Sequence, residues 1–466
     1  MGYNPPMASK HAFQAPKGTR DFFPEDMAVR RHLERIWRDV SIRHGFDEIE
    51  GPTFEHLELY TAKSGEGIVS ELFSFRRAGG DTDYALRPEF TPTLARMVAA
   101  RAAQLPKPTK WFTAGPFFRA ERPQRGRLRE FLQWNVDFIG LPGFEDASTS
   151  DDFARITSRA DSECVACCVD LLRSTGLASA DVKIRVSYRP MVVALLDETG
   201  ASGHAREAAM QLLDRRSKLP AERMAEAASE LGWNIDRFDE LVNQQTSAII
   251  RGNQFYKNAG YEIDLSIVSE LQRRFEELGC VDWIEWDLSI VRGLAYYTGM
   301  VFEVIADGER AVAGGGRYDN LIELFGGPPT PAVGFGMGDV VLTNLLRDKG
   351  LLPEGAALLE SLSAPPASSR PDAFVFTADD ALDPIVRRLV ADLRRGTGHN
   401  PLHARHPYKA TRNIGKLLKE AAAQHARVAV IIESDTTATL KPLDAGEQTQ
   451  CALADAAAVI ARLVSR

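Results

Sequence analysis

The sequence predicts an α+β protein with two domains: a long domain built on a mostly antiparallel sheet with a helical insertion, and a smaller α/β domain after it. Strand-like runs occur from about 84 to 140 and from 286 to 340, and the stretch between them, about 190–280, has helical periodicity. The segment 362–371, LSAPPASSRP, has the proline and serine content of a linker. A chain of 466 residues also exceeds the usual size of one compact domain.

Composition places the chain among ordinary globular proteins, with 44% hydrophobic and 26% charged residues. No apolar run approaches the roughly 18 residues that cross a bilayer, and the first residues contain no hydrophobic stretch suited to a signal peptide. Five irregularly spaced cysteines indicate a reducing compartment and no disulfide framework. We therefore expect a cytoplasmic protein with no membrane partner.

Three of the cysteines, Cys164, Cys167 and Cys168, lie in the run ECVACC. Their i, i+3, i+4 spacing places them on one face of a helix, where small soft side chains pack well. A metal site needs further ligands nearby, and the neighbouring sequence supplies none. This pattern predicts a helix packed into the core, and no metal site is expected.

Net charge excludes an unspecific nucleic-acid coat, because the chain carries −8 at pH 7. The tail from 371 to 466 is mildly basic, with 13 Lys/Arg against 11 Asp/Glu. That asymmetry suits either a polyanionic partner or a solvated surface, and a local cluster of arginines can still bind phosphate.

The elements of the long domain follow from local signals. Residues 1–13 are expected to be flexible, and the domain is expected to span 14–350. A helix is predicted in PEDMAVRRHLERIWRDVSIRHG, which begins with proline and acidic residues and stops at Gly45. The tail, 372–466, follows a linker at 351–371 and contains DAFVFT, DPIVRRLVADLRRGTG, YKATRNIGKLLKEAAAQH and RVAVIIES, which predict strand, helix, helix and strand.

The segment 84–97, YALRPEFTPTLARM, predicts a strand that Pro88 ends and a helix that Pro92 opens. Glu89 and Thr91 then lie at the edge of the strand. A carboxylate and a hydroxyl so placed suit a small amine-bearing ligand, although Glu89 is equally able to pair with an arginine such as Arg87.

The richest segment is 111–140, WFTAGPFFRAERPQRGRLREFLQWNVDFIG, in which two strand-like runs flank a loop. Alternation in the second run sends Gln133, Asn135 and Asp137 to the face opposite its large apolar residues. A polar outer face and a charged loop are the ordinary explanation. Arginines this close repel one another unless an anion lies among them, and guanidinium groups match phosphate oxygens, so the sequence predicts a phosphate ligand over the sheet. The arginines of the loop are Arg119, Arg122, Arg125, Arg127 and Arg129.

Two glycine-rich stretches, AGGGRYDNL at 313–321 and GFGMGD at 334–339, match neither a P-loop nor a dinucleotide fingerprint. Glycines beside strands let a ligand approach the backbone, but they also form plain turns or bulges.

Five motifs taken together, in this order and spacing, resemble histidyl-tRNA synthetase, a class II aminoacyl-tRNA synthetase: LRPEFT, FRAERPQRGRLREFLQ, RGLAYYTGMVFE, GGGRYDNL and AVGFGMG. The run GFDEIEGPTFEHLELY is similar to the family's dimer-forming first motif, with Pro52 as its proline. The resemblance covers about 14–350 and resumes in the tail. It implies a class II catalytic domain on an antiparallel sheet, an α/β anticodon-binding domain at 372–466, and a homodimer.

The implied reaction uses histidine, ATP and tRNA(His). The carboxylate of histidine attacks the α-phosphorus of ATP to give histidyl-adenylate and pyrophosphate, and the histidyl group then passes to the terminal adenosine of the tRNA. Mg²⁺ would bridge the phosphates. Such a reaction depends on alignment and charge stabilisation, which explains a site dominated by arginines.

The resemblance also carries site residues to matching positions. Arg119 and Arg292 are implied as catalytic residues, Arg119 on the α-phosphate and Arg292 where other class II enzymes use a further metal ion. ATP would also contact Glu121 and Arg127, and Gln124 and Arg129 would meet the acceptor end of the tRNA. The residues implied to bind histidine are Glu89, Thr91, Gln133, Asp137, Tyr296, Tyr297 and Tyr318.

Three positions depart from the family pattern. Asp137 stands where glutamate is common, and Ala295 stands where aspartate is usual. The third motif usually ends GLERL but here reads GDVVL, which puts Val341 where an arginine normally clamps ATP. The residue that replaces this arginine is not identified by the sequence.

Two alternative functions share parts of the pattern. One is a synthetase-like regulatory or histidine-binding protein, of the type that serves as regulatory subunit of ATP phosphoribosyltransferase. The other is a class II synthetase for another amino acid. The arginine loop and the C-terminal domain disfavour the first, and the Arg-Gly-Leu-x-Tyr-Tyr run disfavours the second.

Overall fold

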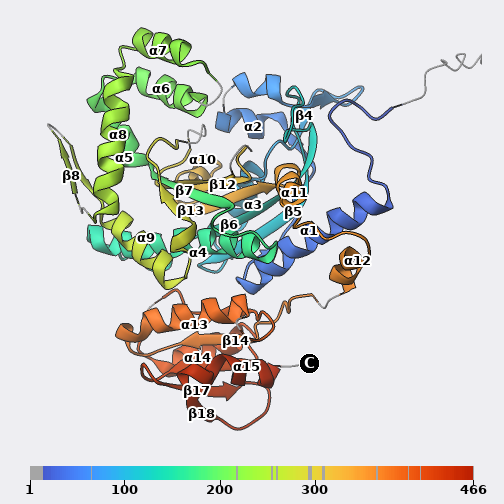
Figure 1. Cartoon of the computed structure of the whole chain (residues 1–466), viewed down its shortest axis with the longest axis vertical. Coiled ribbons are helices and arrows are strands. Elements are labelled where there is room, and N and C mark those ends of the chain that lie inside the picture. The colour runs from blue at the N-terminus through green and yellow to red at the C-terminus, as the bar shows by residue number, and fades with distance from the viewer. Residues whose placement is uncertain are drawn as a thin grey trace, which may run out of the picture.

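The structure, a computed structural model, describes residues 14–64, 66–216, 219–252, 255–258, 261–291, 296–306, 310–363, 366–396, 398–409 and 411–464. Residues 1–13, expected to be flexible, lie outside the described residues, as do Arg292 and Ala295. Figure 1 shows a large N-terminal part above a smaller C-terminal one.

An eight-stranded sheet forms the centre of the N-terminal part, in the order β1-β5-β6-β13-β12-β11-β7-β10. Its two edge pairs, β1 with β5 and β10 with β7, are parallel, and every other neighbouring pair is antiparallel, which confirms the mostly antiparallel prediction. The strands are β1 (Asp47–Glu48), β5 (Thr109–Phe118), β6 (Glu130–Ile139), β7 (Val182–Tyr188), β10 (Ile284–Trp286), β11 (Met300–Ala306), β12 (Ala313–Arg317) and β13 (Ala332–Gly338).

One face of this sheet packs on α1 (Pro24–Arg43), α4 (Ser150–Ser174) and α11 (Asp339–Asp348). Trp37 of α1 stacks on Trp134 of β6 with ring centroids 6.5 Å apart. The alternation of β6 is as predicted, because its large apolar residues enter this core. The helix α1 ends as predicted before Gly45, whose φ of 75° suits glycine. The three cysteines of α4 are buried in the same core, which confirms their packing role.

The opposite face carries a second apolar cluster that includes α3 (Thr91–Arg101), α10 (Leu321–Leu324), Tyr297 and Tyr318. Next to α3 lie α2 (Leu57–Ser64) and a small antiparallel sheet, which is ordered β2 (Phe54–His56), β4 (Asp83–Leu86) and β3 (Ser74–Arg76). Pro88 follows β4 and Pro92 lies in the first turn of α3, as predicted. Polar residues of β6 therefore face a region bordered by α3 and the tyrosines.

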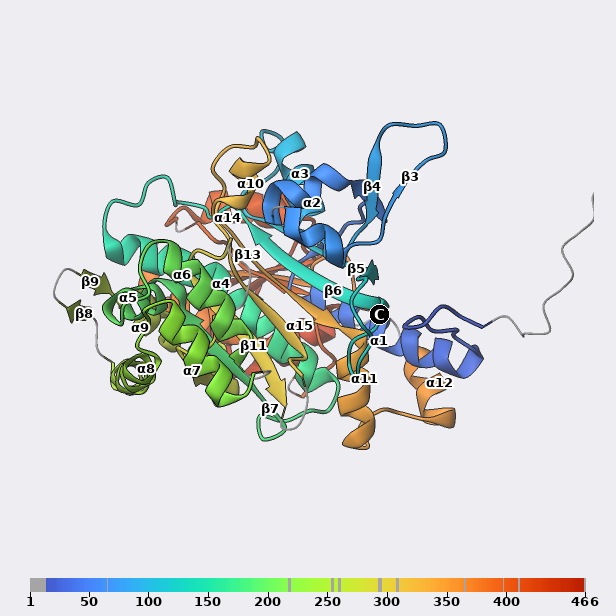
Figure 2. The same ribbon diagram turned by 90° about the horizontal axis from the view of Figure 1, so that it is seen from above.

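The predicted insertion at about 190–280 is helical for most of its length, with a short hairpin of β8 (Phe255–Asn258) and β9 (Tyr261–Asp264) within it. Its helices join the same continuous core as the sheet. Figure 2 shows them to one side of the central strands, with β3 and β4 on the other. The helices are α5 (Arg189–Glu198), α6 (His204–Asp214), α7 (Ala221–Glu230), α8 (Ile235–Ile250) and α9 (Ser266–Glu277).

The segment predicted as a linker, 351–371, contains a helix, α12 (Gly355–Ser363), which packs on α1. His32 Nδ1 lies 2.9 Å from Ser361 Oγ, and the amide of Ala367 donates to Asp39 Oδ1 at 3.0 Å. The connection is thus held against the N-terminal part. Local composition did not indicate this helix, because proline and serine dominate only the residues that follow it.

The C-terminal part is a five-stranded sheet in the order β15-β14-β16-β17-β18, with parallel pairs at β14 and antiparallel pairs beyond β16. The predicted strand, helix, helix and strand correspond to β14, α13, α14 and β16, so the α/β prediction is confirmed. The elements are β14 (Ala373–Phe376), α13 (Asp383–Arg395), β15 (Ala404–Arg405), α14 (Ile414–Ala423), β16 (Val428–Ile432), β17 (Thr437–Pro442), β18 (Thr449–Ala452) and α15 (Ala456–Val464).

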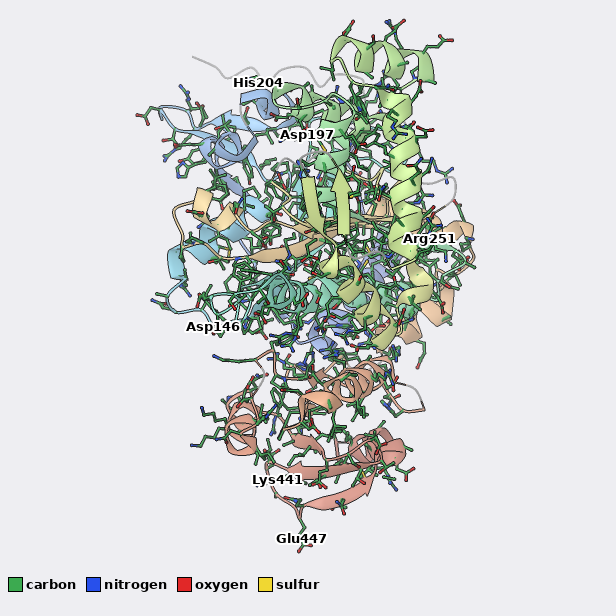
Figure 3. All side chains as sticks on the ribbon, turned by 90° about the vertical axis from the view of Figure 1, so that its left-hand side faces the viewer. Asp146, Asp197, His204, Arg251, Lys441 and Glu447 are labelled. Carbon is green, nitrogen blue, oxygen red and sulfur yellow. The ribbon has the colours of Figure 1, made fainter. Side chains whose placement is uncertain are left out.

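Buried charges join the two parts of the chain. Lys110 Nζ of β5 donates to Glu163 Oε1 of α4 at 2.8 Å and to the Tyr408 hydroxyl at 2.8 Å. Arg394 of α13 donates to the same Glu163 oxygen at 2.9 Å, and Arg387 to Glu277 at 2.6 Å. In Figure 1 α13 faces α4 and α9 across this boundary. Figure 3 shows Lys441 and Glu447 at the far end of the C-terminal part.

None of the helices in the described part of the chain is long and apolar enough to span a membrane.

Candidate active site

The polar face of β6 forms the floor of the candidate site, with Gln133, Asn135 and Asp137 in alternate positions. Gln133 Oε1 and Asn135 Nδ2 are buried and have no hydrogen-bond partner among the described residues. Buried polar atoms normally have partners, so these two indicate a place where a ligand binds. The polar side chains predicted to share one face of this strand do so, and this face is the candidate ligand site.

Glycines of the neighbouring strand β13 make room for these side chains. Gly334 pairs with Asp137 and Gly336 with Asn135 in the antiparallel register. A Cβ on Gly334 would overlap Asp137 Oδ1, and one on Gly336 would overlap the Gln133 amide. The glycines of the GFGMGD stretch in β13 do not form a turn, and they let polar side chains of β6 lie across the strand.

Asp137 is the central acid of the floor. It is 5% exposed, and the Tyr318 hydroxyl donates a hydrogen bond to its Oδ1. Burial raises the pKa of Asp137 to about 7, while the hydrogen bond from Tyr318 opposes that rise. Ionising a buried carboxyl that has no countercharge costs free energy, and a cationic ligand would stabilise its ionised form.

Tyrosines form the wall beside Asp137. The Tyr296 ring lies edge-on to the Tyr318 ring with centroids 6.0 Å apart, and 4.8 Å from the Tyr297 ring. Tyr297 and Tyr318 are buried, and Tyr296 is half-buried. All three residues predicted from the Tyr-Tyr and GGGRYDNL motifs therefore meet at one place.

A buried ion pair, which sequence reasoning missed, holds this wall in position. Arg317 donates to Asp161 Oδ1 of α4 at 2.5 Å and to Asp319 Oδ1 at 3.0 Å. The Thr298 hydroxyl donates to the other Asp319 oxygen at 2.9 Å, which fixes the segment after Tyr297. The one signal in the sequence was an aspartate within the apolar stretch of α4, and aspartates are seldom fully buried unless paired.

Glu89 lies between β4 and α3, Thr91 is the first residue of α3, and both are half-buried. Arg119 connects the segment before Glu89 to the arginine loop, because its Nε donates to the Pro88 carbonyl at 3.2 Å. Its guanidinium also lies 5.2 Å from the centre of the Phe131 ring. Arg87 is buried and binds Glu50 at 2.6 Å.

The arginine loop forms a tight turn, in which Gln124 and Arg127 exchange backbone hydrogen bonds around Gly126. Arg127 pairs with Glu121 at 2.8 Å and Arg125 with Asp348 at 2.9 Å. These carboxylates neutralise part of the repulsion that motivated the phosphate prediction. Arg129 donates to the carbonyls of Glu121 and Lys17 at 3.3 and 3.4 Å, and so supports the loop from within.

Asp137 and the arginine loop lie toward opposite ends of β6, and Gln133 lies between them. The loop immediately precedes the strand, and Asp137 lies near its far end. At about 3.3 Å per residue, Gln133 and Asp137 are about 13 Å apart along the strand. The site is therefore elongated, with an acidic, tyrosine-lined end and a basic end. The predicted residue Arg292 lies outside the described residues.

No group of three or more His, Cys, Asp or Glu side chains able to hold a metal ion occurs among the residues that the structure describes. A Mg²⁺ ion at this site would take phosphate oxygens and water among its ligands, as Mg²⁺ commonly does with nucleotides.

A model of the histidyl-tRNA synthetase family matches residues 18–339, which include every element of the candidate site. The chain belongs to the histidyl-tRNA synthetase family. Among its curated relatives, the histidine–tRNA ligase of Haloarcula marismortui is 37% identical over 458 residues, covering 95% of this chain and 96% of the relative. The histidine–tRNA ligase of Pyrococcus horikoshii is 33% identical, with coverage of 97% and 99%. The chloroplastic and mitochondrial histidine–tRNA ligase of Arabidopsis thaliana is 34% identical, with coverage of 94% and 85%.

Solved structures agree with this membership at the level of the fold. The histidyl-tRNA synthetase from Nostoc sp. PCC 7120 superposes with a TM-score of 0.56 at 24% identity, covering 97% of this chain and all of that chain. A protein from Bacillus halodurans C, described as an ATP phosphoribosyltransferase regulatory subunit/histidyl-tRNA synthetase, gives a TM-score of 0.57 at 22% identity, with coverage of 88% and 97%. The mostly antiparallel sheet domain and the C-terminal α/β domain expected from the sequence are thus both present in this family member.

Proposed function

We propose that this synthetase attaches histidine to tRNA(His) in two steps that share the β6 site. A carboxylate oxygen of histidine bonds to the α-phosphorus of ATP as the bond to pyrophosphate breaks, giving histidyl-adenylate. A hydroxyl of the terminal adenosine of the tRNA then takes the histidyl group, and AMP leaves. The elongated floor, acidic at one end and basic at the other, is the observation that carries the proposal.

The acidic end is assigned to histidine. Asp137 and Glu89 are the carboxylates that would receive the α-ammonium group. Thr91 and Gln133, whose Oε1 has no partner among the described residues, are assigned to the backbone end of histidine. Tyr296, Tyr297 and Tyr318 would enclose the imidazole, because aromatic walls with hydroxyl groups offer both packing and hydrogen bonds. Asp137 stands where the family commonly has glutamate and is one methylene shorter, and its Oδ1 accepts a hydrogen bond from Tyr318.

The basic end is assigned to ATP. Arg119 would stabilise charge on the α-phosphate, and Arg127 with Glu121 would contact the nucleotide from the loop. Arg292 is assigned to the same phosphate by its motif position alone. Mg²⁺ is proposed to arrive with ATP and to neutralise charge on the phosphates.

The remaining assignments concern partners and location. Gln124 and Arg129 are proposed to face the acceptor end of tRNA(His), and the C-terminal domain, 372–466, to bind its anticodon. The catalytic domain is proposed to span 14–350, and 351–371 to connect it to the C-terminal domain. We also propose that the protein works as a homodimer through the segment that contains Pro52, and that it acts in the cytoplasm.

Histidine-dependent exchange of pyrophosphate into ATP tests the proposal directly. The purified chain should exchange pyrophosphate with histidine and with no other amino acid in a screen of the standard set. Binding of histidine without exchange would favour a regulatory protein, and exchange with another amino acid would reassign the pocket. Among the alternatives, the regulatory type is disfavoured by the retained arginine loop, since a protein that only binds histidine does not need it.

A further inference from the structure

The third motif lacks its usual arginine, and the structure shows what Val341 does in its place. Val341 lies in the first turn of α11 and is 7% exposed. Its Cγ2 lies 3.1 Å from the position that a Cβ on Gly126 would occupy. Val341 therefore packs under the tip of the arginine loop and offers no charge to a ligand.

A different arginine reaches the same place from the connection between two strands. Arg310 lies between β11 and β12, and its Cδ is 3.6 Å from the same Cβ position on Gly126. Its guanidinium donates to the side-chain oxygen of Gln124, on the other side of the turn. The aliphatic stem of Arg310 and the side chain of Val341 thus converge on one glycine, and the guanidinium extends along the loop.

The charge of Arg310 is balanced differently from that of three nearby arginines. Arg125 pairs with Asp348, Arg127 with Glu121, and Arg20 with Asp339 at 2.7 Å. Within the part of the chain that the structure describes, Arg310 has no carboxylate within 4.0 Å, and its partner is a neutral amide. Its positive charge is therefore available to an anion at the basic end of the site.

We propose that Arg310 is the cation that binds the β- and γ-phosphates of ATP in this protein, in place of an arginine at position 341. The inference rests on the proposed function, because it assigns the basic end to ATP. Gln124 serves as the neutral partner that aims the guanidinium, and exchanging an amide contact for phosphate oxygens replaces a neutral hydrogen bond by charge-assisted ones. Arg310 contacts the leaving pyrophosphate and no part of the adenylate.

The test compares Arg310→Met, which keeps the length of the stem without the charge, with Arg310→Lys, which keeps the charge. We expect Arg310→Met to raise the KM for ATP in pyrophosphate exchange at least tenfold, with Arg310→Lys between it and the wild type. A non-hydrolysable histidyl-adenylate analogue, which has no β- or γ-phosphate, should bind all three proteins within twofold. The control is Arg223→Met on α7, which removes an exposed arginine paired with Glu226 at 3.0 Å, and its KM for ATP should stay within twofold.

An unchanged KM for ATP in Arg310→Met would overturn the inference. Equal losses for the methionine and lysine variants would show that the charge is not used, and a loss of analogue binding as large as the loss for ATP would show that Arg310 only supports the loop. If the wild-type chain exchanges no pyrophosphate, the proposed function fails, and calorimetric titration with ATP still measures the contribution of Arg310 separately.

Discussion

Two regions of this protein concentrate charge, the interface between its two parts and the face of β6, and they use it in opposite ways. At the interface Lys110, Glu163 and Arg394 are at most 8% exposed, and each charge is met by another. Burial lowers the pKa of Lys110 to about 8, and the Glu163 carboxylate opposes that change. The charges of this network are paired, because Glu163 lies between the two cations, although Arg394 Nη2 has no hydrogen-bond partner among the described residues.

The polar face of β6 lacks such a pairing of opposite charges among the described residues. Gln133 and Asn135 keep buried atoms without partners among the described residues. Burial raises the pKa of Asp137, whose hydrogen bond from the neutral Tyr318 hydroxyl opposes that rise without supplying a countercharge. Arg310 likewise donates to an amide. Buried charges that are paired with opposite charges stabilise the fold, whereas buried polar or charged groups without such partners indicate a ligand-binding site. Four experiments test this difference, beginning with the largest expected effect.

Breaking the paired network should cost the most stability. Glu163→Gln leaves Lys110 and Arg394 buried without a countercharge, and we expect a loss of about 3–5 kcal/mol in the free energy of unfolding. Chemical denaturation monitored by circular dichroism measures it. The matched control is Glu145→Gln, which removes an exposed partner of Lys107 and should change stability by about 1 kcal/mol or less. Equal effects of both changes would remove the distinction between the two regions.

Arg119→Ala should affect catalysis and leave folding largely intact. We expect kcat/KM for pyrophosphate exchange to fall about 10²–10³-fold, because one preorganised donor to developing charge is lost. The melting temperature, measured on the same sample, should remain close to the wild-type value, since Arg119 is half-buried and its described backbone partner is the Pro88 carbonyl. A drop in melting temperature comparable to that of Glu163→Gln would place Arg119 with the structural charges.

Replacing the glycine of β13 that lies against Asp137 should weaken histidine binding. Gly334→Ala puts a methyl group onto Asp137 Oδ1, and overpacking of this kind costs about 1–3 kcal/mol. We expect the KM for histidine to rise about tenfold or more. Gly338→Ala is the control, because a Cβ there meets no atom within 4 Å. Equal KM values for the two alanine variants would show that the strand can shift to accept the methyl group.

The smallest effect concerns pH. The pKa of Asp137 is raised to about 7, so the acid is mostly protonated at pH 6 and mostly ionised at pH 8. Only the ionised form attracts an ammonium group, and histidine should therefore bind more tightly as pH rises, by up to about tenfold per unit below pH 7. Calorimetric titration of wild type and Asp137→Asn separates this proton from that of the imidazole. A pH profile unchanged in the variant would contradict the assignment.

Much of this architecture follows from the sequence alone, because strand and helix periods are local properties. The alternation at 132–138 fixed which residues of β6 face the core, and the spacing of the cysteines in α4 fixed their burial. Motif order was enough to indicate the family and most of the candidate site. The helix α12 escaped notice, since its packing on α1 depends on residues more than 300 positions away.

Tertiary structure alone decided which charges are paired with opposite charges and which are not. The sequence around Lys110 does not predict its contacts with Glu163 and Arg394, because these residues come together only when the two domains pack. The same holds for Gly334 beneath Asp137 and for Arg310 beside Gly126, which depend on strand register and on the path of a distant connection. Sequence determined the kinds of side chain on each element, whereas the balance of their charges depends on distances between elements, which only the folded chain sets.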